Sequence, residues 1–163
     1  MANPKYRPRR GRTSIRMSKT RSIHHIVFAT KRRESTIPEI YKKELYGYIN
    51  GILTNRKCHL LRMNGRPDHI HILVDIHPTV ALADLVKTLK QSSGNWLRNH
   101  PHFYMFDKWA EGYYAVSVGI DGIEACRNYI INQEIHHQDK TMIKEMEEMA
   151  KAYGLVWHPD DWF

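Results

Sequence analysis

The chain has 163 residues, a size that suits a single domain with one hydrophobic core. Apolar residues make up 42% of it, including four Trp and nine Tyr, which is typical of a globular rather than a disordered chain. It contains no run of 18 apolar residues and opens with no apolar segment, so we expect neither a membrane span nor a secretory signal. Cys58 and Cys126 are isolated, which excludes a cysteine zinc site and predicts buried thiols in a reducing cytoplasm.

The formal charge of +8 resides in an N-terminal arm. The first 21 residues carry eight Lys and Arg and no acid, whereas the remaining 17 basic and 17 acidic residues of the chain cancel. Residues 1–20 show no hydrophobic periodicity, so we expect a disordered basic arm ahead of a single domain over residues 21–163. Such an arm favours phosphate backbones through counterion release. A solubilising leader, or a start codon placed too far upstream, explains it about equally well.

The first predicted element is a strand over residues 22–31, in which His24 and His25 interrupt an apolar run. Either histidine could face a neighbouring strand, although a hydrogen-bonded sheet histidine is the commoner role. The strand ends in a basic turn. Arg32 and Arg33 in this turn would suit a phosphate contact, although such a run is usually only solvated surface.

Next come a helix over residues 38–56, a strand over residues 57–63 and a hairpin turn, Asn64-Gly65-Arg66-Pro67. The chain that leaves this turn alternates polar and apolar residues from Asp68 to Asp75. Its β-branched content supports a further strand, antiparallel to the one before it.

Two histidines of this strand share a face. Successive side chains on a strand point to opposite faces, so His69 and His71 emerge together, roughly 6.5–7 Å apart, while Ile70 and Ile72 face the other way. Two imidazoles at this separation can coordinate one cation between them. A bare His-x-His is more often a chance occurrence on a half-exposed strand, so by itself the signal is weak.

A helix over residues 79–99 follows, with an apolar side and a polar, partly basic face that carries Lys87, Lys90 and Ser92. A solvated face is the default interpretation. The loop over residues 103–113 is rich in aromatic residues. Beside Lys108 these rings could stack on unpaired bases, although packing of the loop onto the sheet is the commoner arrangement.

A strand over residues 114–118 leads into a second amphipathic stretch, residues 126–137, which predicts a helix. Tyr129 and Gln133 are four residues apart and would therefore stack on one face of this helix. A phenol and an amide on one face could meet a metal ion held by the histidine strand. A helical tyrosine is more commonly a core residue with its hydroxyl capped.

The last predicted helix covers residues 139–153, and its methionine-rich stripe indicates core packing or a dimer contact. The order strand–helix–strand–strand–helix–strand is ferredoxin-like. We therefore expect an α+β fold, in which an antiparallel sheet carries helices on one face and C-terminal helices follow the βαββαβ unit.

Taken together, these stretches resemble the single-tyrosine HUH transposases, the small enzymes of insertion sequences and of REP-associated tyrosine transposase genes. Asp68-His69-Ile70-His71 resembles their histidine–hydrophobe–histidine signature, and Tyr129-Ile-Ile-Asn-Gln133 resembles their tyrosine helix. Residues 25–31, 89–93 and 112–119 look like their first strand, middle helix and last strand. Each motif alone is weak, but five in the right order between about residues 22 and 153 are a strong match.

The resemblance implies metal-dependent cleavage and rejoining of single-stranded DNA by a catalytic domain over residues 21–163. Tyr129 would be the nucleophile that forms a 5′-phosphotyrosine and releases a 3′-hydroxyl, so strands could be rejoined without ATP. A phenol with a pKa near 10 is a poor nucleophile at neutral pH. His69, His71 and Gln133 would therefore hold an assisting divalent ion, Mg²⁺ or Mn²⁺.

The resemblance also implies DNA hairpins at element or repeat ends as substrates, read by shape as well as by bases. The candidate DNA-binding residues are Arg32, Arg33, Lys87, Lys90, Ser92 and Lys108. It further implies a homodimer, in which the tyrosine helix of one subunit can complete the histidine site of the other. The expected location is the prokaryotic cytoplasm, at the nucleoid.

His136 and His137 depart from the simplest family members. They could add a metal ligand or a proton carrier, but a role in capping the helix C-terminus is favoured. Two alternatives to a transposase remain open. One is a non-catalytic single-stranded nucleic-acid binder, although the aromatic motifs of RNA-recognition modules are missing. The other is a domesticated relative or a nickase with the same chemistry but no mobile element.

Overall fold

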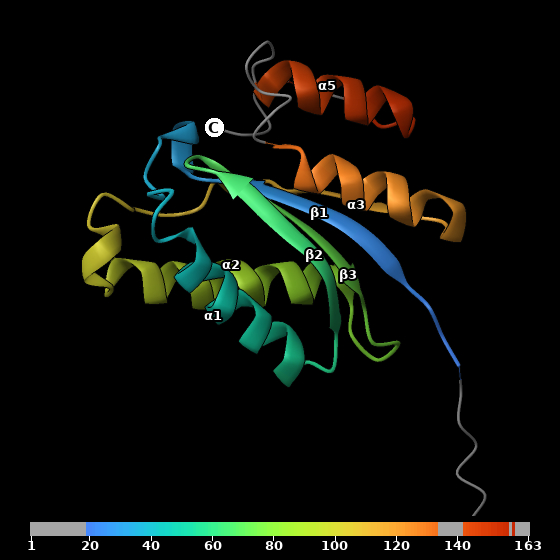
Figure 1. Cartoon of the computed structure of the whole chain (residues 1–163), viewed down its shortest axis with the longest axis horizontal. Coiled ribbons are helices and arrows are strands. Elements are labelled where there is room, and N and C mark those ends of the chain that lie inside the picture. Colours follow the sequence, from blue (N-terminus) through green and yellow to red (C-terminus); the bar gives the residue numbers. More distant parts are fainter. Residues whose placement is uncertain (1–18, 134–141, 157, 159–163) are drawn as a thin grey trace, which may run out of the picture.

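A computed structural model describes residues 19–133, 142–156 and 158, and it is organised around a four-stranded antiparallel sheet (Figure 1). In the order in which they lie side by side, the strands are β2 (His59–Arg66), β3 (His69–Asp75), β1 (Ile23–Ala29) and β4 (Tyr114–Ser117). Helix α1 (Lys42–Asn55) connects β1 to β2, and α2 (Leu82–Arg98) connects β3 to β4. The predicted ferredoxin-like α+β class is confirmed.

The helices lie in two layers. α1 and α2 cover one face of the sheet, whereas α3 (Ile123–Ile131) and α5 (Met142–Ala152) lie on the opposite face (Figure 1). The prediction of helices on one face therefore holds for the βαββαβ unit, and the C-terminal helices add a second layer. Three 3₁₀ turns complete the described elements: η1 (Lys31–Arg33), η2 (Pro101–Phe103) and η3 (Ile120–Gly122). Among the described residues, no helix is long and apolar enough to cross a membrane.

The larger hydrophobic core lies between the sheet and the α1–α2 layer. Ile70, Ile72 and Val74 of β3 are at most 1% exposed and belong to one buried cluster with Leu45 of α1 and Leu85 of α2. These positions are the apolar half of the alternating pattern of β3. The prediction of which alternate residues face the core is therefore confirmed.

The opposite face carries two smaller apolar clusters. Val27 of β1 packs with Val116 of β4 and with Met146 of α5, which is fully buried, so the methionine stripe contributes to the core. Leu73 of β3 packs with Cys126 and other residues of α3. Both cysteines are buried free thiols, as expected, and burial raises the pKa of Cys126 to about 11, which makes its thiol unreactive at neutral pH.

The hairpin between β2 and β3 turns later than predicted, because β2 continues to Arg66 and the loop is Pro67-Asp68. Tertiary hydrogen bonds hold this loop. The Pro67 carbonyl accepts from two backbone N–H groups of the segment after η1, and the Asp68 carbonyl accepts from the N–H of Thr30. At Gly65 a Cβ would collide with the carbonyl oxygen of His69, so only glycine lets β2 approach the start of β3 this closely.

Candidate active site

His69 and His71 lie side by side on the face of the sheet covered by α3 and α5. Both side chains are buried, 1% and 0% exposed, and their ring centroids are 5.1 Å apart. In the ladder, His69 is opposite Ala29 of β1 and His71 is opposite Val27. The parity of β3 thus brings the two imidazoles together, as the sequence predicted.

Asp68 orients the first imidazole. Its Oδ1 lies 2.7 Å from Nδ1 of His69. Burial tends to raise the pKa of the Asp68 carboxyl, but the hydrogen bond to His69 and the charge of that ring outweigh burial and lower it. An ionised Asp68 that accepts the Nδ1–H of His69 makes Nε2 the nitrogen that a metal ion would use, the usual arrangement of a carboxylate behind a metal-binding histidine.

His25 orients the second imidazole. Its Nε2 lies 3.0 Å from Nδ1 of His71, and the two rings stack with centroids 5.2 Å apart. Burial lowers the pKa of His25 to about 4, so this ring is neutral at pH 7 and can accept the Nδ1–H of His71. Of the two β1 histidines left open by the sequence, His25 therefore contacts the histidine pair, whereas the ring of His24 lies 3.3 Å from the carbonyl of Ser22.

Glu145 of α5 adds a carboxylate that sequence reasoning missed. It is 8% exposed, and its Oε1 lies 3.9 Å from Nε2 of His71. The ligand atoms of His69, His71 and Glu145 all lie within 4.8 Å of one another. Burial, followed by the charge of Asp68, raises the pKa of Glu145 to about 7. The sequence feature that could have indicated its burial is its position within the apolar stripe, three residues after Met142 and four before Met149.

Gln133 is fully buried, and its Nε2 donates to Oε1 of Glu145 over 2.9 Å. Helix α3 ends at Ile131, so Gln133 lies two residues beyond α3, although its own backbone is again helical. Its amide nevertheless contacts the same carboxylate that approaches His71. His136 and His137 lie outside the described residues.

Tyr129 of α3 lies against the histidine cluster. Its ring centroid is 5.8 Å from that of His71 and 6.1 Å from that of His25, both in edge-to-face arrangements. The hydroxyl donates to Sδ of Met149 of α5 over 3.3 Å. The tyrosine helix and the histidine pair that it approaches thus belong to the same chain.

Asn64 of β2 anchors the end of the tyrosine helix. Its Nδ2 donates to the carbonyl oxygens of Ile130 at 3.0 Å and Ile131 at 3.4 Å, which belong to the last turn of α3. Terminal helix carbonyls have no intrahelical partner, so this side chain satisfies them and fixes α3 against the sheet. Asn64 is also opposite His71 in the β2–β3 ladder, so one ladder position connects the histidine strand to the tyrosine helix.

The donor set fits a divalent ion. Two imidazoles are oriented by Asp68 and His25, and a carboxylate approaches within a few ångströms of them in a buried site. The amide of Gln133 is bonded to the same carboxylate. Nitrogen and oxygen ligands of this kind suit Mn²⁺, Mg²⁺ or Zn²⁺, and the carboxylate and amide oxygens favour the first two.

The basic turn after β1 lies at the histidine end of the sheet. Thr30 follows Ala29, the ladder partner of His69, and η1 comes next. Arg32 and Arg33 both adopt left-handed φ angles of 54° and 56°, which are strained for side-chain-bearing residues and cost about 1 kcal/mol or more each. An open pocket of about 440 Å³ beside this turn is lined by Arg32, Lys108 and neighbouring residues, so the structure brings these two predicted DNA-binding residues together.

The predicted basic face of α2 lies on the other side of the sheet from the histidines. Lys87 and Lys90 line a second open pocket of about 290 Å³, which shares Glu111 with the first. The ammonium of Lys90 donates to the carbonyls of Glu111 and Gly112, and burial lowers its pKa. Ser92 is half-buried and lines neither pocket.

Comparisons with known proteins found one matching family and similar solved structures. Residues 18–133 match the family model described as Transposase IS200 like. A solved structure from Deinococcus radiodurans R1, provisionally described as a transposase, is 24% identical with a TM-score of 0.54, and the match covers 77% of this chain and 98% of that one. A REP-associated tyrosine transposase bound to a REP hairpin is 13% identical with a TM-score of 0.57, and the match covers 90% and 92%. No curated protein matches the chain.

Proposed function

The chain belongs to the IS200-like transposase family, whose model spans residues 18–133, and on that premise we propose that it cleaves and rejoins single-stranded DNA through Tyr129. One observation carries the proposal. The ring of Tyr129 lies 5.8 Å from that of His71, within the cluster formed by the histidine pair, Glu145 and Gln133. A candidate nucleophile and a candidate metal site on a transposase fold are the parts that strand transfer requires.

In the proposed reaction the oxygen of Tyr129 forms a bond to the phosphorus of a backbone phosphate. The bond from that phosphorus to the 3′ oxygen of the preceding nucleotide breaks. The phenol proton passes to solvent and the departing 3′ oxygen takes up a proton, so the products are a 5′-phosphotyrosine and a 3′-hydroxyl. Attack by another 3′-hydroxyl restores the phenol and rejoins the strand, and the phosphodiester energy is conserved in between.

His69 and His71, with the oxygens of Gln133 and Glu145, are the residues that would hold the divalent ion, Mg²⁺ or Mn²⁺. When bound, such an ion polarises the phosphoryl oxygen and stabilises charge on the leaving oxygen. Asp68 and His25 act through the two histidines as positioning residues. The hydroxyl of Tyr129 donates to the thioether of Met149, and it would give up this hydrogen bond when it loses its proton.

A DNA hairpin is the proposed substrate. The similar REP-associated transposase was solved bound to a REP hairpin, which supports this choice. Arg32, Arg33 and Lys108 are the proposed phosphate contacts, because the turn that carries the arginines lies at the histidine end of the sheet. Lys87, Lys90 and Ser92 on α2 would contact a more distant part of the DNA. Activity on chromosomal hairpins would place the protein in the cytoplasm, at the nucleoid.

The homodimer implied by the resemblance is not required to assemble this site. Tyr129, His69 and His71 come from one chain, and their rings already lie together. We therefore propose that the tyrosine acts in cis. Mixing Tyr129→Phe protein with His69→Ala/His71→Ala protein tests this directly, since restored activity would require exchange of the tyrosine helix between subunits.

The test of the function is covalent capture. The protein is incubated with end-labelled single-stranded hairpins and Mn²⁺, and the mixture is run on a denaturing protein gel. We expect a labelled band at protein mass that is absent without metal, in Tyr129→Phe and in His69→Ala/His71→Ala. Tyr48→Phe is the matched control, because Tyr48 lies on α1, across the sheet from the site, and the change keeps its ring against Trp96, so it should form the adduct normally. An adduct that persists in Tyr129→Phe would overturn the nucleophile assignment.

A further inference from the structure

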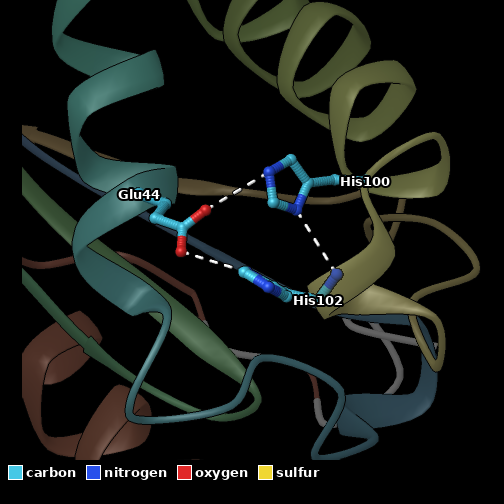
Figure 2. A group of neighbouring side chains, drawn as sticks. All are labelled: Glu44, His100 and His102. Carbon is cyan, nitrogen blue, oxygen red and sulfur yellow. Dashed lines mark hydrogen bonds and ion pairs between the residues drawn. The ribbon is translucent and has the colours of Figure 1, made fainter.

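A second cluster of side chains that could hold a metal ion lies away from the histidine strand, at the start of α1 and after the end of α2 (Figure 2). Glu44 comes from the first turn of α1, His100 precedes η2, and His102 lies within η2. Figure 2 shows the carboxylate of Glu44 facing both imidazoles, with one oxygen directed toward each. Oε2 lies 3.2 Å from Nε2 of His100, and Oε1 lies 3.0 Å from Nδ1 of His102.

The distances within the cluster are close to those that a tetrahedral site requires. An ion with metal–ligand bonds of about 2.0–2.1 Å holds its ligand atoms roughly 3.3–3.4 Å apart. The two nitrogen–oxygen distances are 3.2 and 3.0 Å, and the ligand atoms of all three residues lie within 4.8 Å of one another. Each nitrogen faces a different oxygen of Glu44, so a rotation of the carboxylate that brings one oxygen toward both nitrogens would admit an ion, with a fourth position open to water.

The imidazoles are held in place by aromatic neighbours. The ring of His102 stacks on Tyr41 with centroids 3.8 Å apart and planes 13° apart, and His100 lies against Trp96 at 4.5 Å. Nδ1 of His100 accepts from the backbone N–H of His102 at 3.4 Å. Metal binding at Nε2 would place the proton on Nδ1 and give up this hydrogen bond, a small loss because 3.4 Å is beyond the usual range.

We propose that Glu44, His100 and His102 form a site for a transition-metal dication of the zinc class, separate from the catalytic centre. Two imidazoles and a carboxylate are ligands that zinc prefers. A bound ion joins the start of α1 to the segment that follows α2, and so stiffens the start of the loop that leads to Lys108 and β4. The site is structural, since none of its residues approaches Tyr129 or the histidine pair.

The test is a titration of the untagged full chain with Co²⁺, whose visible absorption reports tetrahedral nitrogen and oxygen ligands. We expect the wild type to bind one more equivalent than Glu44→Gln or His102→Gln, or each variant to bind that equivalent at least about tenfold more weakly. His59→Gln is the matched control, because His59 is exposed at the start of β2 and should leave binding unchanged.

A second readout does not depend on colour or activity. Zinc should raise the melting temperature of the wild type and of His59→Gln more than that of Glu44→Gln, whereas all three should melt alike in EDTA. Both variants replace side chains that are 41% exposed, so they are expected to fold. Equal binding and equal zinc shifts in wild type, Glu44→Gln and His102→Gln would overturn the proposal and identify the cluster as an ion-paired patch only.

Discussion

Strand β3 sends alternate side chains into two different environments. Toward α1 and α2 it contributes Ile70, Ile72 and Val74 to a continuous apolar core, whereas toward α3 and α5 it contributes His69 and His71. Both sets are almost completely buried. Burial alone stabilises apolar side chains. A buried imidazole instead loses its hydrogen bonds to water and must replace them with hydrogen bonds to other residues. The polar half therefore requires additional residues, and these partners form the candidate active site.

Substitutions on the two faces of β3 should have opposite effects on stability and activity. Ile72→Ala removes a fully buried side chain between the helices and the sheet, and we expect a loss of about 2–5 kcal/mol in the free energy of unfolding by urea. Adduct formation per folded molecule should be retained. His71→Ala, one residue earlier, should abolish the adduct while the chain still folds. If both variants lost activity only in proportion to unfolding, the division between the faces would be wrong.

Asp68→Asn tests the orientation of the first imidazole. The change keeps the shape of the side chain but removes the charge that accepts from Nδ1 of His69, so we expect Mn²⁺ affinity to fall by about 10–100-fold. Asp75→Asn at the other end of β3 is the control, because Asp75 accepts from the N–H of Ser22, far from the histidines along the strand. Mn²⁺ affinities measured by calorimetry should separate the two variants, and equal affinities would contradict a positioning role for Asp68.

The pH dependence of stability in metal-free buffer tests the shifted pKa values of two buried groups, His25 and Glu145. The pKa of His25 is lowered from 6.5 to about 4, so its contribution is present above pH 6.5 and is lost as pH falls toward 4. The pKa of Glu145 is raised from 4.5 to about 7, so its contribution is present below pH 4.5 and is lost as pH rises toward 7. Between pH 4.5 and 6.5 the two slopes oppose each other.

Replacing Glu145 should expose the histidine slope. In Glu145→Gln we expect the free energy of unfolding to rise with pH more steeply than in the wild type, by up to about 1.4 kcal/mol per pH unit between pH 4.5 and 6.5. Urea unfolding in EDTA across this range measures the slope. Glu147→Gln, an exposed position of the same helix, should keep the wild-type slope. A Glu145→Gln slope equal to that of the wild type would refute the raised pKa.

Asn64→Ala should have the smallest effect. It removes the side-chain donor to the last carbonyls of α3, and we expect a loss of about 1 kcal/mol in stability and a several-fold slower adduct formation. Metal affinity should stay unchanged, because Asn64 positions the tyrosine helix and not the histidines. Asn95→Ala on α2 is the matched control, with no expected change in adduct rate. A change in metal affinity in Asn64→Ala would mean that the two halves of the site are not separable.

Local patterns in the sequence were sufficient for much of this molecule. The alternation of β3 predicted which residues face the core and placed His69 beside His71, because strand parity needs only local geometry. The order of elements predicted the ferredoxin-like class, and the spaced motifs predicted the family. Element boundaries were less exact. For example, α1 begins at Lys42 rather than Pro38, since Pro38 and Tyr41 first form two successive turns.

The partners of the histidines were decided by tertiary structure. In β1 the run from Ile23 to Phe28 is apolar except for two adjacent histidines. No alternation therefore shows which of the two lies on the face of the sheet that carries His71. Glu145 resembles the other charged residues of its helix until α5 packs across β1 and β4 and buries it beside His71. A sequence determines which face of its own element a residue occupies, but the contacts of that face depend on how distant elements pack, and that packing made these groups into one site.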